Sequence, residues 1–404
     1  MGIAMHLRDK TIVIGVCGGI AAYKAAELVR LYVKAGAEVH VILTRSAQEF
    51  ITPLTFQTLT GNPVHTEMFN LVQEREIGHI SLADRADVFV VAPATANLIG
   101  KVAAGLADDL LSTSLMATKA PVLFAPAMNV NMWDNPIYQQ NQARLRMLGY
   151  RFVDPVTGFL ACGWEGKGKL ADPAEIFEET LALLTPQDFA DETVLVTAGP
   201  TREEIDPVRF ISNYSSGKMG YALARAARLR GARVILVSGP SALAVPWGVE
   251  RLAVVSAEEM REAVLSRWEE ATVVIKAAAV ADYRPAVRAA GKVKKEGRES
   301  LSLALEKNPD ILAELGRRKG HRFLVGFAAE TSDLLENARK KLRAKNLDLM
   351  VANDVTQERA GFDVDTNIVR LLGPDEAEEA LPEMSKDEVA GHILDRIRAL
   401  RRKA

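Results

Sequence analysis

The feature that most constrains the fold of this 404-residue chain is a local pattern that occurs twice, in residues 11–44 and 193–240. Each copy has an apolar run, a break at glycines or other small residues, apolar residues at helical spacing and a second apolar run. In the first copy Gly36 ends the helix, and in the second residues 200–217 are inserted before the helix. Two copies of this pattern predict two doubly wound, Rossmann-like α/β domains with mainly parallel sheets.

The boundary between these domains is expected in residues 183–193, LLTPQDFADET, which are polar and contain a proline. A chain of this length can form two domains with separate cores. We therefore predict one domain over residues 1–190 and a second over residues 191–404.

Five further apolar runs predict buried strands that end in small residues. They are residues 86–95, 120–128, 271–280, 322–330 and 347–354. Ligands of doubly wound sheets bind at the carboxyl ends of the strands, so the loops that follow these runs are the candidate sites.

Composition excludes several classes of protein. The formal net charge of −2 gives no general preference for nucleic acid or anionic membranes. No apolar run is long enough to cross a bilayer, and the apolar stretch near the start alternates like a strand, so no signal peptide is predicted. Cys17 and Cys162 form neither a disulfide framework nor a zinc-ligand pattern, and we expect a reducing, cytoplasmic environment.

Two segments of the first half carry weak signals on their own. GVCGGIAAYK, residues 15–24, joins a strand to a helix and fits either a phosphate site or a plain tight turn. Its spacing is not the G-x-G-x-x-G of dinucleotide-binding proteins. His79 precedes an apolar-periodic stretch, and such a lone histidine is more often structural than catalytic.

Two other segments of the first half point to a pocket. PAMNVNMWDNP, residues 126–136, combines Asn, Met and Trp side chains after a buried strand, and it fits a pocket or an Asn-capped turn. ACGWEGKGKL, residues 161–170, is so rich in glycine that we expect a loop. Its Cys162 fits either a reactive thiol on a mobile loop or a small residue in a turn.

The second half has several features that bind phosphates in other proteins. FISNYSSGKMG, residues 210–220, is a polar turn before a helix, although Met219 breaks the P-loop pattern. KVKK (292–295), KNPDI (307–311) and KKLRAK (340–345) each read as solvated surface when taken alone. The last of them places two lysines at i, i+4 on one helix face. Together they favour a triphosphate site.

In this order the motifs resemble the bacterial bifunctional proteins of coenzyme A biosynthesis, which join phosphopantothenoylcysteine decarboxylase to phosphopantothenate–cysteine ligase. GGIAAYK, GHISL, APATAN, PAMNVNMW and ACGWEGKG resemble the flavin-dependent decarboxylase. ISNYSSGKMG, AAAVADYRP, KVKK, KNPDI, GFAAET and KNLDLMVANDV resemble the ligase. The resemblance covers nearly the whole chain and implies a flavoprotein-type first domain and a ligase-type second domain.

The resemblance implies that the first domain binds FMN and decarboxylates the cysteine conjugate of 4′-phosphopantothenate. The implied FMN-binding residues are Gly18, Gly19, Ile20, Thr44, Thr95, Ala96 and Asn97. His79 is implied as a base or orienting group and Asn129 as the group that holds the substrate. Cys162 is implied as the acid that returns a proton after CO₂ is lost.

The resemblance implies that the second domain joins 4′-phosphopantothenate to cysteine through an acyl-cytidylate formed from CTP, with Mg²⁺ on the triphosphate. Lys292 would serve the activation step and Asn213 would hold the acyl-cytidylate. The implied CTP-contact residues are Ala277, Ala278, Asp282, Lys292, Asn308, Pro309, Asp310, Ile311, Phe327, Lys341 and Lys345. No protein ligand of Mg²⁺ is implied.

The implied assembly is a homo-oligomer, a dodecamer of trimeric decarboxylase and dimeric ligase domains, with no nucleic-acid or membrane partner. Two other functions remain as alternatives. One is an NAD(P)-dependent reductase, which the missing G-x-G-x-x-G disfavours. The other is a non-catalytic flavin-binding regulatory subunit, which the presence of His79, Asn129 and Cys162 disfavours.

Overall fold

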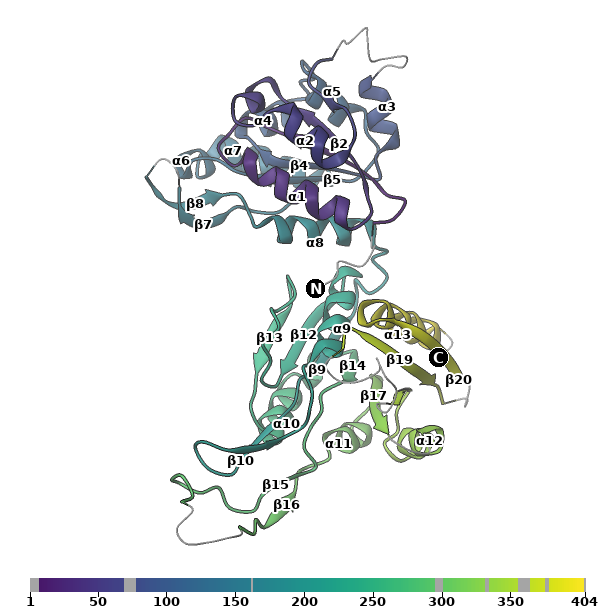
Figure 1. Cartoon of the computed structure of the whole chain (residues 1–404). Coiled ribbons are helices and arrows are strands. Elements are labelled where there is room, and N and C mark those ends of the chain that lie inside the picture. Colours follow the sequence, from purple (N-terminus) through teal and green to yellow (C-terminus); the bar gives the residue numbers. More distant parts are fainter. Residues whose placement is uncertain are drawn as a thin grey trace. The chain divides into compact units, whose positions relative to one another are not determined.

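The computed structural model describes residues 7–68, 78–160, 163–294, 301–330, 334–354, 364–374 and 378–402. The chain divides into two compact units, Met1–Pro186 and Gln187–Ala404, and each has its own sheet covered by helices (Figure 1). The predicted fold class, two α/β domains with mainly parallel sheets, is confirmed.

The first unit is built on a six-stranded sheet, and its described strands pair in parallel in the order β3-β2-β1-β4-β5-β6. The strands are β1 (Thr11–Val16), β2 (Glu38–Leu43), β3 (Val64–His65), β4 (Val88–Ala94), β5 (Val122–Pro126) and β6 (Arg151–Phe152). β1, β2, β4 and β5 are almost continuously buried, as is typical of strands with both faces covered.

Helices cover both faces of this sheet. They are α1 (Ala22–Lys34), α2 (Pro53–Thr60), α3 (Gly78–Arg85), α4 (Ala96–Ala104), α5 (Leu110–Ala117), α6 (Val130–Trp133), α7 (Pro136–Met147), α8 (Pro173–Leu184) and the 3₁₀ turn Arg45–Glu49. The buried stripe of α1 includes Tyr32, whose hydroxyl lies 2.7 Å from the Thr180 hydroxyl of α8. This contact holds α8, the last helix of the unit, to α1.

The second unit contains an eight-stranded sheet in the order β13-β12-β9-β14-β17-β18-β19-β20. The strands are β9 (Thr193–Ala198), β12 (Arg233–Ser238), β13 (Glu250–Ala253), β14 (Val273–Lys276), β17 (Phe323–Glu330), β18 (Leu349–Asp354), β19 (Thr366–Leu372) and β20 (Glu378–Ser385). The first six pair in parallel, and β19 and β20 add antiparallel pairings.

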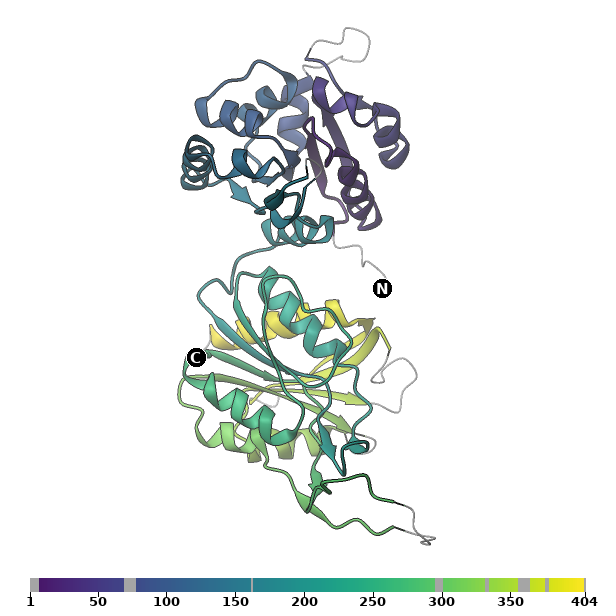
Figure 2. The same cartoon turned by 90° about the vertical axis from the view of Figure 1, so that its left-hand side faces the viewer.

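Two layers of helices enclose this sheet, as Figure 2 shows. α9 (Lys218–Leu229) and α13 (Lys386–Arg401) cover one face. α10 (Ala257–Ser266), α11 (Ile311–Arg317) and α12 (Leu334–Ala344) cover the other, together with the 3₁₀ turn Trp268–Glu270.

Two small antiparallel ribbons, β10 (Arg202–Glu204) with β11 (Phe210–Ser212) and β15 (Tyr283–Pro285) with β16 (Leu305–Lys307), lie apart from the large sheet of the second unit. In Figure 1, β10, β15 and β16 extend beyond one end of that sheet. The insertion at residues 200–217 therefore forms the β10–β11 ribbon and the turn that precedes α9.

The parallel strands of the two units have the same order when numbered within each unit, 3-2-1-4-5-6. In this order the chain leaves the two central strands toward opposite faces of the sheet, which opens a crevice at their carboxyl ends. The crevice lies between β1 and β4 in the first unit and between β9 and β14 in the second.

One local prediction was wrong. Residues 161–170 were expected to form a loop, but Glu165–Lys169 is strand β8, which pairs with β7 (Val156–Phe159) in an antiparallel hairpin. Lys345 directly follows α12, which ends at Ala344, and its N–H bonds to the Lys341 carbonyl at 3.0 Å. The i, i+4 relation expected for the two lysines is therefore retained.

Among the described residues, no helix combines the length and the apolar character that a bilayer crossing requires.

Candidate active sites

The predicted ligand residues of the first unit lie after four neighbouring strands, in the spatial order β2, β1, β4 and β5. Gly18 follows β1, Thr44 follows β2, Thr95 follows β4 and Asn129 follows β5. Backbone bonds join these strand ends, from the Thr44 N–H to the Val16 carbonyl at 3.1 Å and from the Cys17 N–H to the Pro93 carbonyl at 3.2 Å. The topology therefore gathers these predicted residues at one edge of the sheet.

The turn between β1 and α1 has the shape of an anion cradle. A Cβ on Gly18 would lie 2.4 Å from the Ser46 Cβ, so only glycine fits against the loop after β2. A Cβ on Gly19 would meet nothing within 4 Å, and the neighbouring Ile20 side chain is 61% exposed. Open backbone at the start of a helix is compatible with a bound phosphate or another anion.

Two threonines shape the loops on either side of this turn. The Thr44 hydroxyl accepts the Ala47 N–H at 3.2 Å, and the Thr95 hydroxyl accepts the Leu98 N–H at 3.4 Å at the start of α4. Asn97, in the first turn of α4, is exposed. These caps fix the backbone around the crevice and leave an amide side chain open to a ligand.

Cys17 is a structural thiol. It is buried, and desolvation raises its pKa to about 11, although hydrogen bonds from Thr95 act in the opposite direction. The side chain is therefore a neutral thiol at pH 7, and it packs between the ends of β1 and β4.

Two predicted catalytic residues are not fully described. His79 lies in the first turn of α3, which precedes β4, but its side chain is outside the described part of the structure. Cys162 lies outside the described residues altogether. Among the described residues on either side of it, the Leu160 N–H bonds to the Trp164 carbonyl at 2.8 Å.

Asn129 is the N-cap of α6, as one of the two interpretations of its motif expected. Its side-chain oxygen accepts the Asn131 N–H at 2.8 Å. Asn135 caps α7 in the same way through the Ile137 N–H at 2.9 Å. Each cap uses the side-chain carbonyl oxygen, so Asn129 fixes the turn between β5 and α6.

The β7–β8 hairpin packs directly against the Asn129 loop. The Met128 N–H bonds to the Gly168 carbonyl at 3.0 Å. A Cβ on Gly168 would lie 2.3 Å from the Met128 carbonyl oxygen, and a Cβ on Gly166 would lie 2.7 Å from a Val130 methyl carbon. Gly168 thus permits close approach of two backbones and Gly166 makes room for the Val130 side chain, which explains why a glycine-rich segment forms a strand here.

We expect Gly168→Ala to impair the decarboxylation that the resemblance implies, because the new methyl group must push the Met128–Asn129 backbone away from the hairpin. A shift of about 1 Å in a substrate-holding group costs about 100-fold in rate. The measurement is kcat/KM for CO₂ release from 4′-phosphopantothenoylcysteine.

Gly158→Ala is the matched control in the same hairpin. Its Cβ would meet only the Lys169 Cδ at 3.7 Å, an ordinary contact, so activity should stay at the wild-type level. Equal activity of the two variants would show that the close approach at Gly168 does not position Asn129.

In the second unit, two buried threonines hold the loop after β14. The Thr197 hydroxyl accepts the Ala278 N–H at 3.2 Å, and the Thr201 hydroxyl accepts the Ala281 N–H at 3.0 Å. Ala277 and Ala278 are partly exposed, and Asp282 is exposed. The backbone of residues 277–282 is therefore fixed across the crevice between β9 and β14.

The KNPDI segment lies beside this loop. The Asn308 N–H bonds to the Asp282 carbonyl, and its side-chain amide bonds to the Ala281 carbonyl, both at 2.8 Å. Asp310 caps α11 through the Ala313 N–H at 3.0 Å and forms an ion pair with Lys345 at 3.0 Å. Most of the predicted nucleotide residues are thus brought together, including Lys345 from beyond the end of α12.

The other predicted nucleotide residues differ in accessibility. Pro309 and Phe327 are half-buried, and Lys341 is exposed. The Ile311 side chain is only 2% exposed and belongs to the core, so this residue offers a ligand only its backbone.

Lys292 and Asn213 lie on the loops around the inserted ribbon. Lys292 is exposed, and no hydrogen bond or ion pair joins it to another described residue. The next residue, Val293, is held at both ends, since its N–H bonds to Asp206 at 3.1 Å and its carbonyl accepts Arg209 at 2.9 Å. The Asn213 amide donates to the Ala279 carbonyl at 3.1 Å.

Asp206 organises the turn that holds Val293, and the sequence analysis missed it. Its buried carboxylate accepts the N–H groups of Val208 and Arg209 at 2.8 and 2.9 Å, besides that of Val293. Hydrogen bonds from the Arg209 side chain hold the pKa of Asp206 well below its usual range. The Asp-Pro pair at 206–207 is a turn signal that would have identified it.

Lys276, the last residue of β14, is a second residue that the sequence analysis missed. It is 9% exposed, and burial is the main reason that its pKa falls to about 8. The neighbouring charge of Lys345 lowers the pKa further, while Asp310 and Asp282 raise it. A lysine that ends an otherwise apolar strand, VVIK, is the signal that would have identified it.

We expect Lys276→Met to stabilise the ligand-free chain at pH 7 by up to about 3 kcal/mol, at about 1.4 kcal/mol for each unit of pKa shift. The pKa falls from 10.5 to about 8 on folding, so the destabilisation is complete below pH 8 and disappears as the pH rises toward 10.5.

Urea unfolding of both chains at pH 7 and at pH 10 measures this difference. An equal gain in stability at the two pH values would contradict a charge-burial origin.

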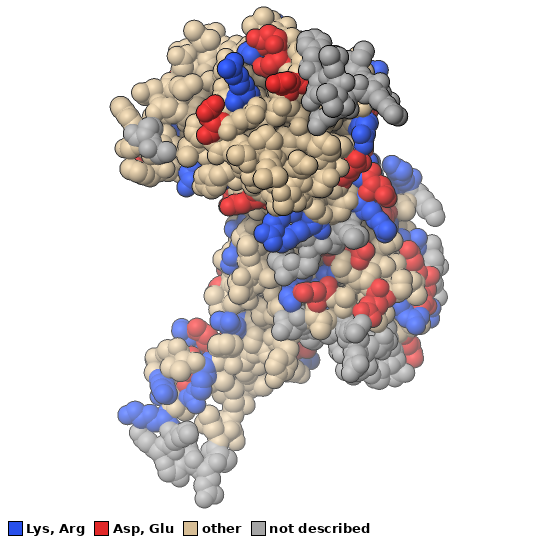
Figure 3. All heavy atoms as spheres, turned by 45° about the horizontal axis from the view of Figure 1, so that its top comes forward, with Lys and Arg blue, Asp and Glu red and all other residues tan. Residues whose placement is uncertain are grey.

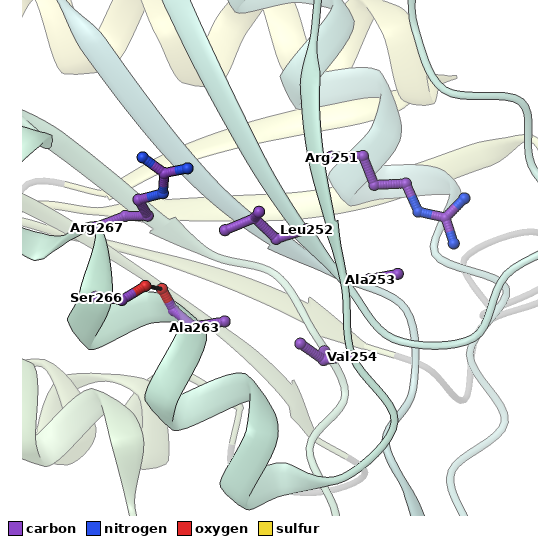
Figure 4. A pocket seen from close by; sticks show the side chains of 7 residues that line it. All are labelled: Arg251, Leu252, Ala253, Val254, Ala263, Ser266 and Arg267. Carbon is purple, nitrogen blue, oxygen red and sulfur yellow. Dashed lines mark hydrogen bonds between the residues drawn. The ribbon is translucent and has the colours of Figure 1, made fainter.

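A shallow groove of about 610 Å³ lies elsewhere, between β13 and α10 (Figure 4). It is lined by Arg251, Leu252, Ala253, Val254, Ala263, Ser266 and Arg267, and it includes none of the predicted site residues. On the face drawn in Figure 3, basic and acidic side chains lie interspersed on both units. The grouping of residues at the strand ends, rather than this groove, therefore identifies the candidate active sites.

Two family models together match almost the whole chain. The Flavoprotein model matches residues 4–185, and the model of the DNA/pantothenate metabolism flavoprotein C-terminal domain matches residues 189–400. The coenzyme A biosynthesis bifunctional protein CoaBC of Bacillus subtilis is 51% identical over 403 residues, which covers 98% of each chain. The Escherichia coli K12 protein of the same name is 46% identical over 394 residues, 96% of this chain and 97% of the relative.

One solved structure covers only the second half of the chain. It is a crystal structure of the C-terminal domain of a coenzyme A biosynthesis bifunctional protein CoaBC, which is 44% identical. It covers 54% of this chain and all of the solved chain, with a TM-score of 0.47.

Proposed function

This chain belongs to the family of coenzyme A biosynthesis bifunctional proteins, and we propose specific roles for its residues on that basis. It is a bifunctional decarboxylase and ligase that carries out two consecutive steps of coenzyme A biosynthesis. Membership of this family favours neither an NAD(P)-dependent reductase nor a non-catalytic flavin-binding subunit.

The observation that carries the assignment of roles is the shared strand order of the two sheets. In both units the family-like motifs lie at the carboxyl ends of the central strands, where a ligand crevice forms. We assign the decarboxylase to residues 1–190 and the ligase to residues 191–404.

In the ligase, the carboxylate of 4′-phosphopantothenate attacks the α-phosphate of CTP, and pyrophosphate leaves. The amine of cysteine then displaces CMP from the acyl-cytidylate, which forms the amide and releases a proton. Lys292 stabilises the charge that develops on the phosphate, and Asn213 holds the acyl-cytidylate. Mg²⁺ accompanies the triphosphate and is held mainly by phosphate oxygens and water.

The CTP site comprises the loop after β14, the KNPDI segment and the lysines at the end of α12. Its residues are Ala277, Ala278, Asp282, Asn308, Pro309, Asp310, Ile311, Phe327, Lys341 and Lys345. Support for this set comes from the hydrogen bonds that join Asn308 to the Ala281–Asp282 backbone and from the Asp310–Lys345 ion pair.

In the decarboxylase, the proposed cofactor is FMN, which supplies the oxidation and re-reduction that make loss of CO₂ possible. Gly18, Gly19 and Ile20 would line its phosphate, with Thr44 near it, and Thr95, Ala96 and Asn97 would lie along the isoalloxazine side. Asn129 holds the substrate carboxylate and amide, and His79 acts as a base or orients the substrate. Cys162 donates the proton that the product requires.

We also propose that the protein is a cytoplasmic homo-oligomer, with trimeric decarboxylase and dimeric ligase domains combined in a dodecamer. Large apolar side chains on the surface support interfaces in both units. Those more than half exposed include Tyr23, Leu54, Ile137 and Phe159 in the first unit and Val208, Val287 and Leu301 in the second.

The test of this function supplies the chain with 4′-phosphopantothenate, cysteine, CTP and Mg²⁺ and measures pyrophosphate and CO₂. We expect both products, and CO₂ should disappear when CTP is omitted, because the decarboxylase then has no substrate. Supplying 4′-phosphopantothenoylcysteine directly should restore CO₂ release without CTP. Absence of pyrophosphate from the complete mixture would refute the ligase assignment, and absence of CO₂ in the last arm would refute the decarboxylase assignment.

A further inference from the structure

Lys276 occupies an unusual position for a lysine. It ends β14, a central strand, and lies between Thr197 of β9 and Gly326 of β17. Side chains alternate along a strand, so Lys276 shares a face with Val274, which packs in the core beneath α10, α11 and α12. The lysine stem is therefore enclosed, and its ammonium group lies at the carboxyl edge of the sheet.

The ammonium group of Lys276 has no partner among the described residues, which join it by neither a hydrogen bond nor an ion pair, although only 9% of the residue is exposed. The described charges that act on it are those of Lys345, Asp310 and Asp282. Asp310 is engaged by Lys345 at 3.0 Å and by the Ala313 N–H at 3.0 Å, and Asp282 is exposed. Within the described part of the second unit, no group thus neutralises this charge directly.

The stability of the folded chain does not explain why a lysine occupies this position. A buried charge without a partner destabilises the folded state, and an apolar side chain would extend the apolar pattern of β14. An anionic ligand would supply the missing partner. The loops that surround the ammonium group, residues 277–282 and 308–311, contain most of the proposed nucleotide contacts.

We propose that Lys276 is a phosphate-binding residue of the ligase, with its ammonium group in contact with a phosphate oxygen of the bound nucleoside triphosphate. The proposal rests on the ligase function proposed above, and it adds a residue to that site. Lysine presents a compact charge with three donors, which suits a phosphate oxygen. A neutral cytosine carbonyl would accept a hydrogen bond but would leave the buried charge uncompensated.

Binding of Mg²⁺–CTP to the full-length chain at pH 7, measured by calorimetry, tests the proposal. Lys276→Met and Lys276→Gln should each weaken CTP binding at least tenfold, as expected for loss of one charge-assisted hydrogen bond. The affinity of both variants for inorganic tripolyphosphate should fall to a similar extent, whereas their affinity for cytidine should equal that of the wild type. The KM for CTP should rise in step with its Kd.

Lys319→Met is the matched control. Lys319 lies between α11 and β17, at the opposite edge of the same sheet, and is paired with Asp348 at 2.5 Å. Its loss should lower the stability of the chain and leave CTP affinity unchanged. Lys276→Met should do the reverse, with higher stability and weaker binding, which a purely structural lysine would not show.

Wild-type CTP affinity in both Lys276 variants would overturn the proposal. The proposal would also be overturned if the variants lost affinity for cytidine to the same extent as for CTP, or if only the KM for 4′-phosphopantothenate rose. In either case the ammonium group would contact something other than the triphosphate. If the wild-type chain forms pyrophosphate and the variants bind CTP normally, only this inference fails. If the wild-type chain itself neither binds CTP nor forms pyrophosphate, the proposed ligase function fails.

Discussion

The placement of β1 beside β4, and of β9 beside β14, determines where ligands can bind in the two units. Each pair is held by parallel hydrogen bonds, so the carboxyl ends of both strands meet at one edge of the sheet. The chain leaves the two strands toward opposite faces, and no connection crosses between them. Side chains that follow these strands therefore converge although they lie far apart in the sequence.

The two units use this edge differently. In the first unit, glycine allows backbones to approach closely, at Gly18 against Ser46 and at Gly168 against Met128. These contacts fix the shape of a site that is proposed to hold a planar cofactor and a small substrate. In the second unit, buried hydroxyl groups of Thr197 and Thr201 hold the loop after β14. Fixed loops of this kind preorganise the charged side chains that are proposed to bind the triphosphate.

Much of this arrangement is predictable from the sequence, because buried parallel strands read as continuous apolar runs and the turns after them are rich in glycine and small residues. The β7–β8 hairpin was not predicted, since glycine is usually a sign of a loop. Here Gly168 faces the backbone of Met128 and Asn129, and Gly166, two residues earlier, faces the Val130 side chain. Only the tertiary structure reveals these contacts.

The missed charged residues have a related explanation. Asp206 acts through the turn that it caps, and Lys276 through its burial among apolar neighbours. Neither the turn that Asp206 caps nor the burial of Lys276 can be inferred from the type of residue or from its spacing in the sequence. The proposed role of Lys276 also implies a conflict between binding and stability. Burial of its charge lowers the free energy of unfolding of the ligand-free chain, and binding of the anionic ligand offsets this loss.

Each unit is proposed to bind its own ligand at the carboxyl ends of its central strands. Hydrogen–deuterium exchange of the full-length chain, with FMN and with Mg²⁺–CTP added separately, measures where each ligand binds. We expect FMN to slow exchange in residues 17–21 and 95–99, and Mg²⁺–CTP to slow it in residues 277–282 and 308–311. Unchanged exchange in these segments while the ligands are bound, with protection at the amino ends of the strands instead, would contradict this proposal.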